Sequence, residues 1–169
     1  EIISVDSLAA LYQSVDFDSN QLNNFEETIN DLKDQTDILM AYYFQLINIQ
    51  IFPSERLQAL LNFWQFAKKN NLEEIAYPLS KNIVDSIQMS SDNINYSSEI
   101  AKSYIFNKDF EKALSWIEFY ENTVGIDENI SLVRIFYNLY SSNDFSSVIN
   151  IIISNFDLFS DSSSRINQE

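Results

Sequence analysis

The sequence contains no cysteine and no histidine, and it has one glycine, Gly125, and two prolines, Pro53 and Pro78. Without cysteine and histidine, the chain has no disulfides, no thiol nucleophile, no common zinc ligands and no side chain that ordinarily titrates near neutral pH. A single glycine cannot build a phosphate-binding loop. Sandwiches, barrels and doubly wound folds need many turn residues, so the composition predicts an all-α protein that is not an enzyme and binds no cofactor.

Basic residues are also scarce, because 10 Lys and Arg stand against 25 Asp and Glu, a formal net charge of −15. Such a surface repels nucleic-acid phosphates and anionic lipids, so neither is an expected partner. No stretch approaches the roughly 20 apolar residues of a membrane span, and no signal peptide is recognisable. We expect a soluble chain without membrane insertion, and the start at Glu1 instead of Met indicates processing or excision from a longer protein.

Acidic residues raise two further hypotheses. Adjacent acids, as in Glu73 and Glu74, could serve in carboxylate catalysis. Each such pair lies at a predicted helix start, however, where acids complement the helix dipole.

Carboxylate and amide oxygens at positions 1, 3, 5 and 12 are typical of a calcium-binding loop, and the segment 16–27 has them. However, Gln21 occupies position 6, where such a loop needs glycine. The alternative is a simple helix N-cap at Asp18, and we expect no metal site. The four loop residues are Asp16, Asp18, Asn20 and Glu27.

Apolar residues are plentiful, at 46% of the chain, and their spacing predicts about nine helices. Pro78 should kink or split the fifth of these, and residues 89–96 read as a loop. The last helix contains a β-branched run, 148–153, that would suit a strand, but its large apolar residues recur at helical spacing, which favours a helix. The predicted helices are 5–15, 19–33, 37–51, 55–69, a segment after Asn71, 97–106, 110–122, 128–140 and 145–156.

Two segments match each other at an offset of 35 residues, so that Phe110 corresponds to Phe145 and Ala113 to Val148. A period of this length is typical of stacked helix hairpins. In the first copy Ala101 and Ala113 would let the two helices approach closely. In the second copy larger residues take both places, which predicts a splayed hairpin.

The first copy resembles the tetratricopeptide repeat, through Ile100-Ala101, Tyr104, Asp109-Phe110, Ala113 and Ile117. The resemblance implies antiparallel helix hairpins stacked as a short tetratricopeptide-like α-solenoid. The hairpins would occupy 54–158, after an atypical helical cap at 1–53 and before a polar tail at 159–169, in one continuous domain.

Tetratricopeptide arrays bind partners in a groove lined by the first helix of each pair. The resemblance therefore implies a non-catalytic scaffold for a protein or peptide, and the groove's aromatic and basic residues would suit a peptide with acidic and apolar side chains. The competing interpretation of these aromatics is core packing. A second function is open as well: a structural self-assembly module whose apolar C-terminal hairpin packs on another copy or on the rest of a longer chain. The groove positions are Trp64, Lys68, Lys102, Phe106, Arg134, Tyr137 and Tyr140.

Overall fold

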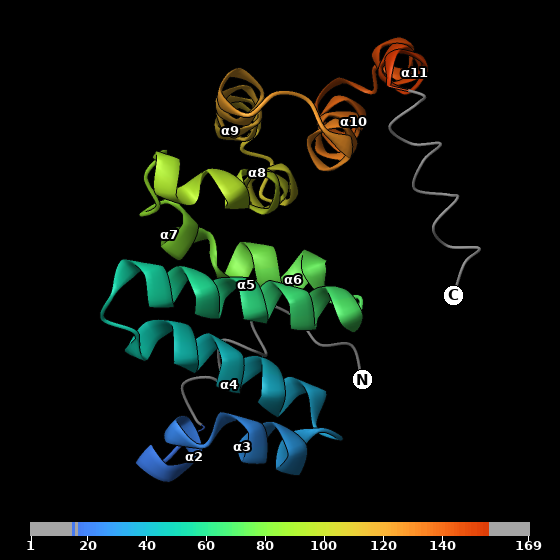
Figure 1. The fold of residues 1–169 in the computed structure, drawn as a ribbon. Helices are drawn as coiled ribbons and strands as arrows, with labels where there is room; N and C mark the ends of the chain where they lie inside the picture. The colour runs from blue at the N-terminus through green and yellow to red at the C-terminus, as the bar shows by residue number, and fades with distance from the viewer. Residues whose placement is uncertain (1–14, 16, 156–169) are drawn as a thin grey trace, which may run out of the picture. The chain divides into compact units, whose positions relative to one another are not determined.

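A computed structural model describes residue 15 and residues 17–155 of the chain, shown in Figure 1. In this part there are ten α-helices, one 3₁₀ helix and no β-strand, so the prediction of an all-α fold is confirmed. The predicted tail at 159–169 and nearly all of the predicted helix at 5–15 lie outside the described residues. None of the described helices is both long and apolar enough to cross a membrane.

The chain separates into two compact units, residues 1–82 and 83–169. In the first unit, α4 (Thr36–Ile49) and α5 (Pro53–Lys69), which lie on either side of the expected transition from cap to hairpins near residue 53, pack against each other. Most large apolar residues of α4 are buried, and α5 supplies one of the helices that cover them.

The first helices described in this unit are α2 (Ser19–Asn23) and α3 (Phe25–Leu32). The sequence predicts one helix here, and two form because the backbone turns at Asn24 with φ −107° and ψ 64°. The Asp18 side chain accepts from the amides of the next turn, as the N-cap interpretation predicts, and the Gln21 side chain completes a capping box. The Tyr42 hydroxyl, on α4, donates to the Gln21 carbonyl oxygen at 2.8 Å and ties α2 to the core.

Prolines set two helix ends in this unit. Pro53 is the first residue of α5, where its missing N–H has no partner to lose, so the helix starts two residues before the predicted position. Phe52 precedes the helix without a side-chain cap. Pro78 ends α6 (Glu73–Leu79) one residue later, and α7 (Lys81–Val84) follows. The predicted split at this proline is confirmed, since proline removes a backbone donor.

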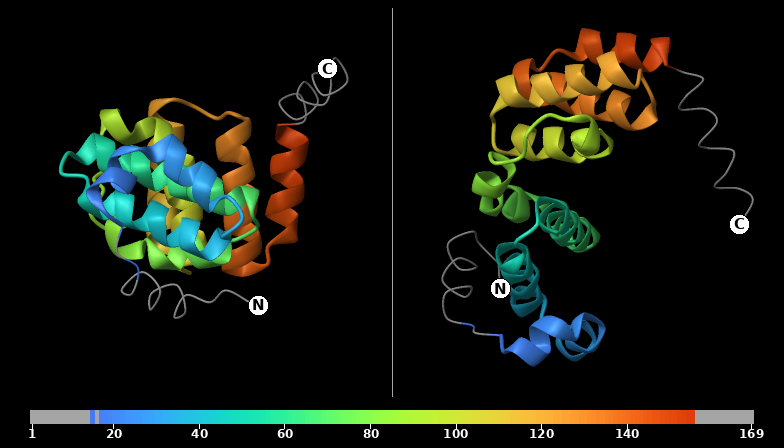
Figure 2. Two further views of the ribbon diagram at one scale, coloured as in Figure 1. Left: turned by 90° about the horizontal axis from the view of Figure 1, so that it is seen from below. Right: turned by 60° about the vertical axis from the view of Figure 1, so that its left-hand side comes forward.

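The second unit contains the 3₁₀ helix η1 (Ser91–Tyr96), which lies in the predicted loop, and a hairpin of α8 (Ser97–Phe106) and α9 (Phe110–Thr123). The hairpin turns within three residues because Lys108 adopts a left-handed conformation, φ 59°. Ala101 and Ala113 are completely buried, which fits the predicted close approach of the two helices. Figure 2 shows these helices in two further views.

The last two helices are α10 (Glu128–Ser142) and α11 (Phe145–Ser154). Asp127 and Asp144 cap them: their carboxylates accept from the amides of Ile130 at 2.9 Å and Ser147 at 3.0 Å. The apolar run of α11 is therefore helical, as its spacing predicts, and not a strand. Only Val148 of this helix is buried, so α11 presents most of its apolar side chains outward.

Candidate functional site

Trp64 lies in the core of the first unit, with 2% of its surface exposed, so its placement on a binding groove is wrong. Its indole Nε1 donates to Ser80 Oγ at 2.9 Å, and its ring meets Tyr77 edge-on at a centroid distance of 5.2 Å. The reason is that α6 covers this face of α5. Lys68, one turn further along, is exposed near the C-terminal end of α5, where a positive charge complements the helix dipole.

The other predicted groove residues lie in the second unit, on α8 and α10, which pack against each other. This packing brings Phe106 of α8 within 6.1 Å of Tyr140 of α10, measured between ring centroids. Tyr137 meets Phe110 edge-on at 6.2 Å. Two of the transferred aromatic residues, Phe106 and Tyr140, therefore meet at the contact between α8 and α10, whereas Tyr137 contacts the start of α9 and is only partly exposed.

Exposed apolar residues on α10 extend this contact. Leu132, Phe136 and Tyr140 follow one another at intervals of four residues, with exposed fractions of 40%, 43% and 56%. The rings of Phe136 and Tyr140 lie 6.4 Å apart. We call these three residues, together with Phe106 beside them, the α10 stripe.

Sequence reasoning missed Leu132 and placed Phe136 at a packing position of the second repeat. The signal that could have identified both was a second apolar row on α10, offset from the row of buried residues Ile130 and Val133. A helix with two apolar rows has more apolar surface than one neighbour can cover.

Both predicted basic residues of this unit are already paired. Lys102 Nζ lies 2.6 Å from Glu99 Oε1, one turn earlier on α8. The Arg134 guanidinium makes two hydrogen bonds to the Glu121 carboxylate, with Nε donating to Oε1 at 3.1 Å and Nη2 to Oε2. Because these charges are neutralised locally, the expected preference for acidic peptides has no support from either residue.

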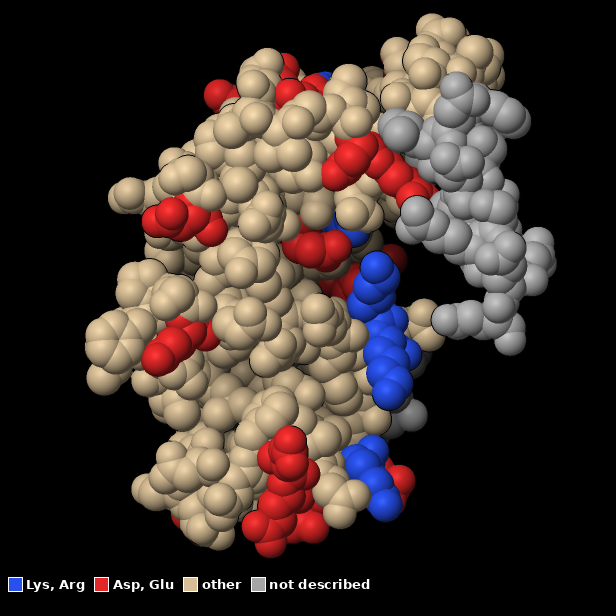
Figure 3. Space-filling view, in the orientation of Figure 1, with Lys and Arg blue, Asp and Glu red and all other residues tan. Residues whose placement is uncertain are grey.

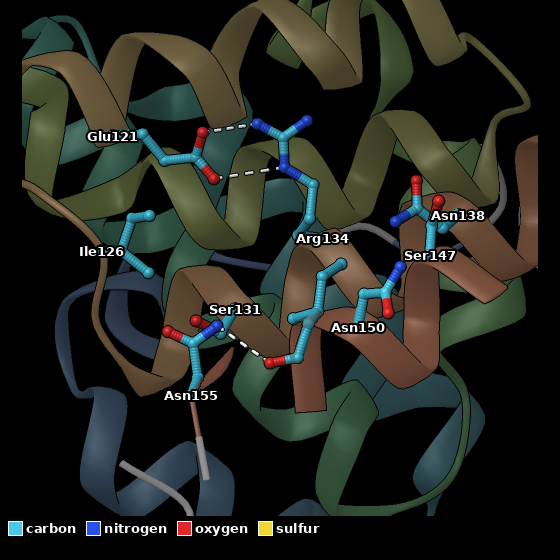
Figure 4. A pocket seen from close by; sticks show the side chains of 9 residues that line it. Glu121, Ile126, Ser131, Arg134, Asn138, Ser147, Asn150 and Asn155 are labelled. Atoms are coloured by element: carbon cyan, nitrogen blue, oxygen red, sulfur yellow. Dashed lines mark hydrogen bonds and ion pairs between the residues drawn. The ribbon is translucent and has the colours of Figure 1, made fainter. Parts of the chain in front are cut away.

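Arg134 faces a pocket of about 490 Å³ between α9, α10 and α11, shown in Figure 4. Amides and hydroxyls dominate its walls, and the Ser131 hydroxyl is buried without a hydrogen-bond partner among the described residues. At about 100° per residue, Arg134 lies on the opposite side of α10 from Phe136, so the pocket and the α10 stripe occupy different faces. The pocket is lined by Glu121, Ile126, Ser131, Arg134, Asn138, Ser147, Asn150, Ile151 and Asn155.

Tyr104 has the most strongly shifted pKa among the described residues. Burial, with the Asp85 charge in second place, raises the pKa of this hydroxyl to about 12, and the hydroxyl donates to the Val84 carbonyl oxygen at 3.3 Å. Lys112 Nζ lies 2.7 Å from Asp85 Oδ1 and 5.3 Å from the centre of the Tyr104 ring. A buried phenol that stays neutral is a poor base, so this cluster joins α8 and α9 to the preceding segment and offers no nucleophile.

The proposed calcium loop is only partly visible. Asp18 accepts from the backbone amides of Asn20 and Gln21, as an N-cap does, while Asp16 lies outside the described residues. Within the described ranges, no three acidic side chains gather closely enough to hold a metal ion. These hydrogen bonds favour the N-cap interpretation of Asp18.

No protein-family model, curated protein or solved structure matches this chain. The resemblance to tetratricopeptide repeats and the solenoid arrangement therefore remain predictions.

Proposed function

We propose that the chain is a non-catalytic helical scaffold that binds a protein or peptide through the α10 stripe. The observation that carries the proposal is the row Leu132, Phe136 and Tyr140, three large apolar side chains that are each 40% or more exposed on successive turns of one helix. Single exposed apolar residues are common on protein surfaces, but a contiguous row of this size is typical of an interaction site.

Aromatic side chains give such a row its binding capacity. Phe and Tyr contribute a large apolar area with few rotatable bonds, and burying the exposed part of each ring stabilises a complex by about 1–2 kcal/mol. The ring of Phe106 supports Tyr140 from α8, which limits the motion that a partner would have to arrest.

The partner's chemistry follows from the surroundings of the stripe. Lys102 and Arg134 are neutralised by their own carboxylates, while the whole chain carries a net charge of −15. We therefore expect a partner segment with two or three apolar anchors, flanked by basic residues and not by acidic ones.

Selection of a displayed library of random peptides on the immobilised chain tests this proposal. The enriched peptides should combine apolar and basic residues, and calorimetry should show that the double variant Phe136→Asp, Tyr140→Asp binds them at least about tenfold more weakly, a loss of ~1.4 kcal/mol. The control is Asn138→Asp, which adds one carboxylate to the same helix on the pocket face and should leave the affinity nearly unchanged.

Circular dichroism of all variants shows whether the helices are retained. If the enriched peptides bind the folded double variant as tightly as the original chain, the stripe is not the binding surface. If the selection enriches no peptide, or enriches acidic ones, the proposed partner chemistry is wrong.

A further inference from the structure

The outer face of α11 carries four large, exposed apolar side chains. Phe145, Ile149, Ile152 and Ile153 are exposed by 64%, 55%, 42% and 68%. Their spacing of four, seven and eight residues from Phe145 puts them on one face of the helix. Together they expose roughly 400 Å², which lies within the range of the largest apolar patch on a typical monomer.

This face is also free of charge. Residues 145–155 contain no Asp, Glu, Lys or Arg, in a chain whose net charge is −15. The part of α11 visible in Figure 3, at the upper right, shows neither acidic nor basic surface. Two copies of so acidic a chain repel each other over most of their surfaces, so a neutral apolar face is where they can approach most easily.

We propose that α11 is a self-association surface, on which two copies of the chain pack their α11 helices against each other in antiparallel orientation. A two-fold arrangement requires a patch that complements itself, and rows of isoleucine at four-residue spacing can interdigitate with an identical row. This surface shares no residue with the α10 stripe, so the two proposals stand independently.

The antiparallel orientation also separates the nearest charges. Asp144 caps the N-terminal end of α11, and its hydrogen bonds from Ser147 lower its carboxyl pKa, so it is negatively charged at neutral pH. A helix of ten residues is about 15 Å long. Antiparallel packing therefore holds the two Asp144 carboxylates farther apart than the Debye length of roughly 8 Å in physiological salt. Parallel packing would bring them together.

The size of the face predicts a weak dimer. Two copies would bury about 800 Å² in total, below the range of stable interfaces, so we expect reversible association with a Kd on the order of micromolar or weaker. Added salt should strengthen this association, because it screens the repulsion between two acidic chains while leaving the apolar contact intact.

Sedimentation velocity over a range of concentrations tests the proposal. The mass should rise from 19.7 kDa towards twice that value, and the double variant Ile149→Asp, Ile153→Asp should stay monomeric. The control Asn150→Asp, Ser154→Asp adds the same charge on the same helix, away from the apolar face, and should still associate. The stripe variant Phe136→Asp, Tyr140→Asp should associate like the original chain.

Several results would overturn the inference. A chain that remains monomeric at millimolar concentration would show that a different segment or another protein covers α11. Association that the Ile149 and Ile153 variant leaves unchanged, with its helices intact by circular dichroism, would place the contact elsewhere. Growth beyond the dimer would rule out a closed two-fold contact.

Discussion

Trp64→Phe removes the indole N–H that donates to Ser80 Oγ and leaves part of a fully buried site unfilled. The lost hydrogen bond costs about 1 kcal/mol. Ser80 keeps its own donor satisfied, because its hydroxyl also donates to the Ala76 carbonyl oxygen at 2.8 Å. The smaller ring adds about 1–2 kcal/mol for lost packing, so we expect the free energy of unfolding to fall by about 2–3 kcal/mol.

Urea unfolding followed by far-ultraviolet circular dichroism measures this change. Ser80→Ala should cost about 1–2 kcal/mol, because it leaves the buried indole N–H without an acceptor. The double variant should cost less than the two single changes added together, with a coupling of about 1 kcal/mol, since it removes both partners. Lys68→Ala, an exposed change one turn away on the same helix, is the control and should lie within about 0.5 kcal/mol of the original chain.

A specific outcome would refute this reasoning. If Trp64→Phe changes the free energy of unfolding by less than about 0.5 kcal/mol with an unchanged urea dependence, then Trp64 is not packed in the core. It would then be available on the surface, as the transferred repeat register first predicted.

Two further predictions concern the second unit. Asp127→Ala should destabilise this unit by about 1 kcal/mol through loss of the α10 cap, and Asp127→Asn, which can still cap, should cost less. The pKa of Tyr120 is raised mainly by its 2.5 Å hydrogen bond to Asp127, so it should fall in both variants when the phenol is titrated spectrophotometrically. An unchanged Tyr120 pKa would contradict the assignment of this hydrogen bond. Burial raises the pKa of Tyr104 to about 12, above the ordinary value near 10, so the neutral phenol contributes stability that is complete below pH 10 and is lost as pH rises towards 12. Tyr104→Phe should remove up to about 2 kcal/mol of that alkaline dependence in urea unfolding between pH 10 and pH 12, and equal slopes for both proteins would contradict it.

Most helix positions could be read from the sequence because their causes are local. Asp18 and Asp127 accept hydrogen bonds from amides two or three residues further along the chain, and such caps depend on no distant contact. Pro78 likewise splits its helix by removing a donor within the same turn. The start of α5 at Pro53, two residues before the predicted start, is also local, because proline favours the first position of a helix.

The binding surface was less predictable, because a repeat register states which helix a residue is on and not what covers it. Phe106 and Tyr140 meet as the register predicts, whereas Trp64, at a corresponding position, is covered by α6. Arg134 was expected to line the groove and contact an acidic partner, but Glu121 on α9 pairs with it. Pairs between residues on different helices leave no trace in the local sequence.

Composition alone determined the all-α class and the absence of histidine and cysteine chemistry, because one glycine and two prolines cannot supply the turns of a sheet protein and missing side chains cannot react. Helical spacing predicted a helix from residue 145 despite the β-branched run, and α11 (Phe145–Ser154) confirms it. Only the tertiary structure decided which apolar faces are covered: α6 buries Trp64, while no described helix covers the α10 stripe or the outer face of α11. The physical reason is that helix propensity and capping act within a turn or two, whereas burial depends on which helices pack together.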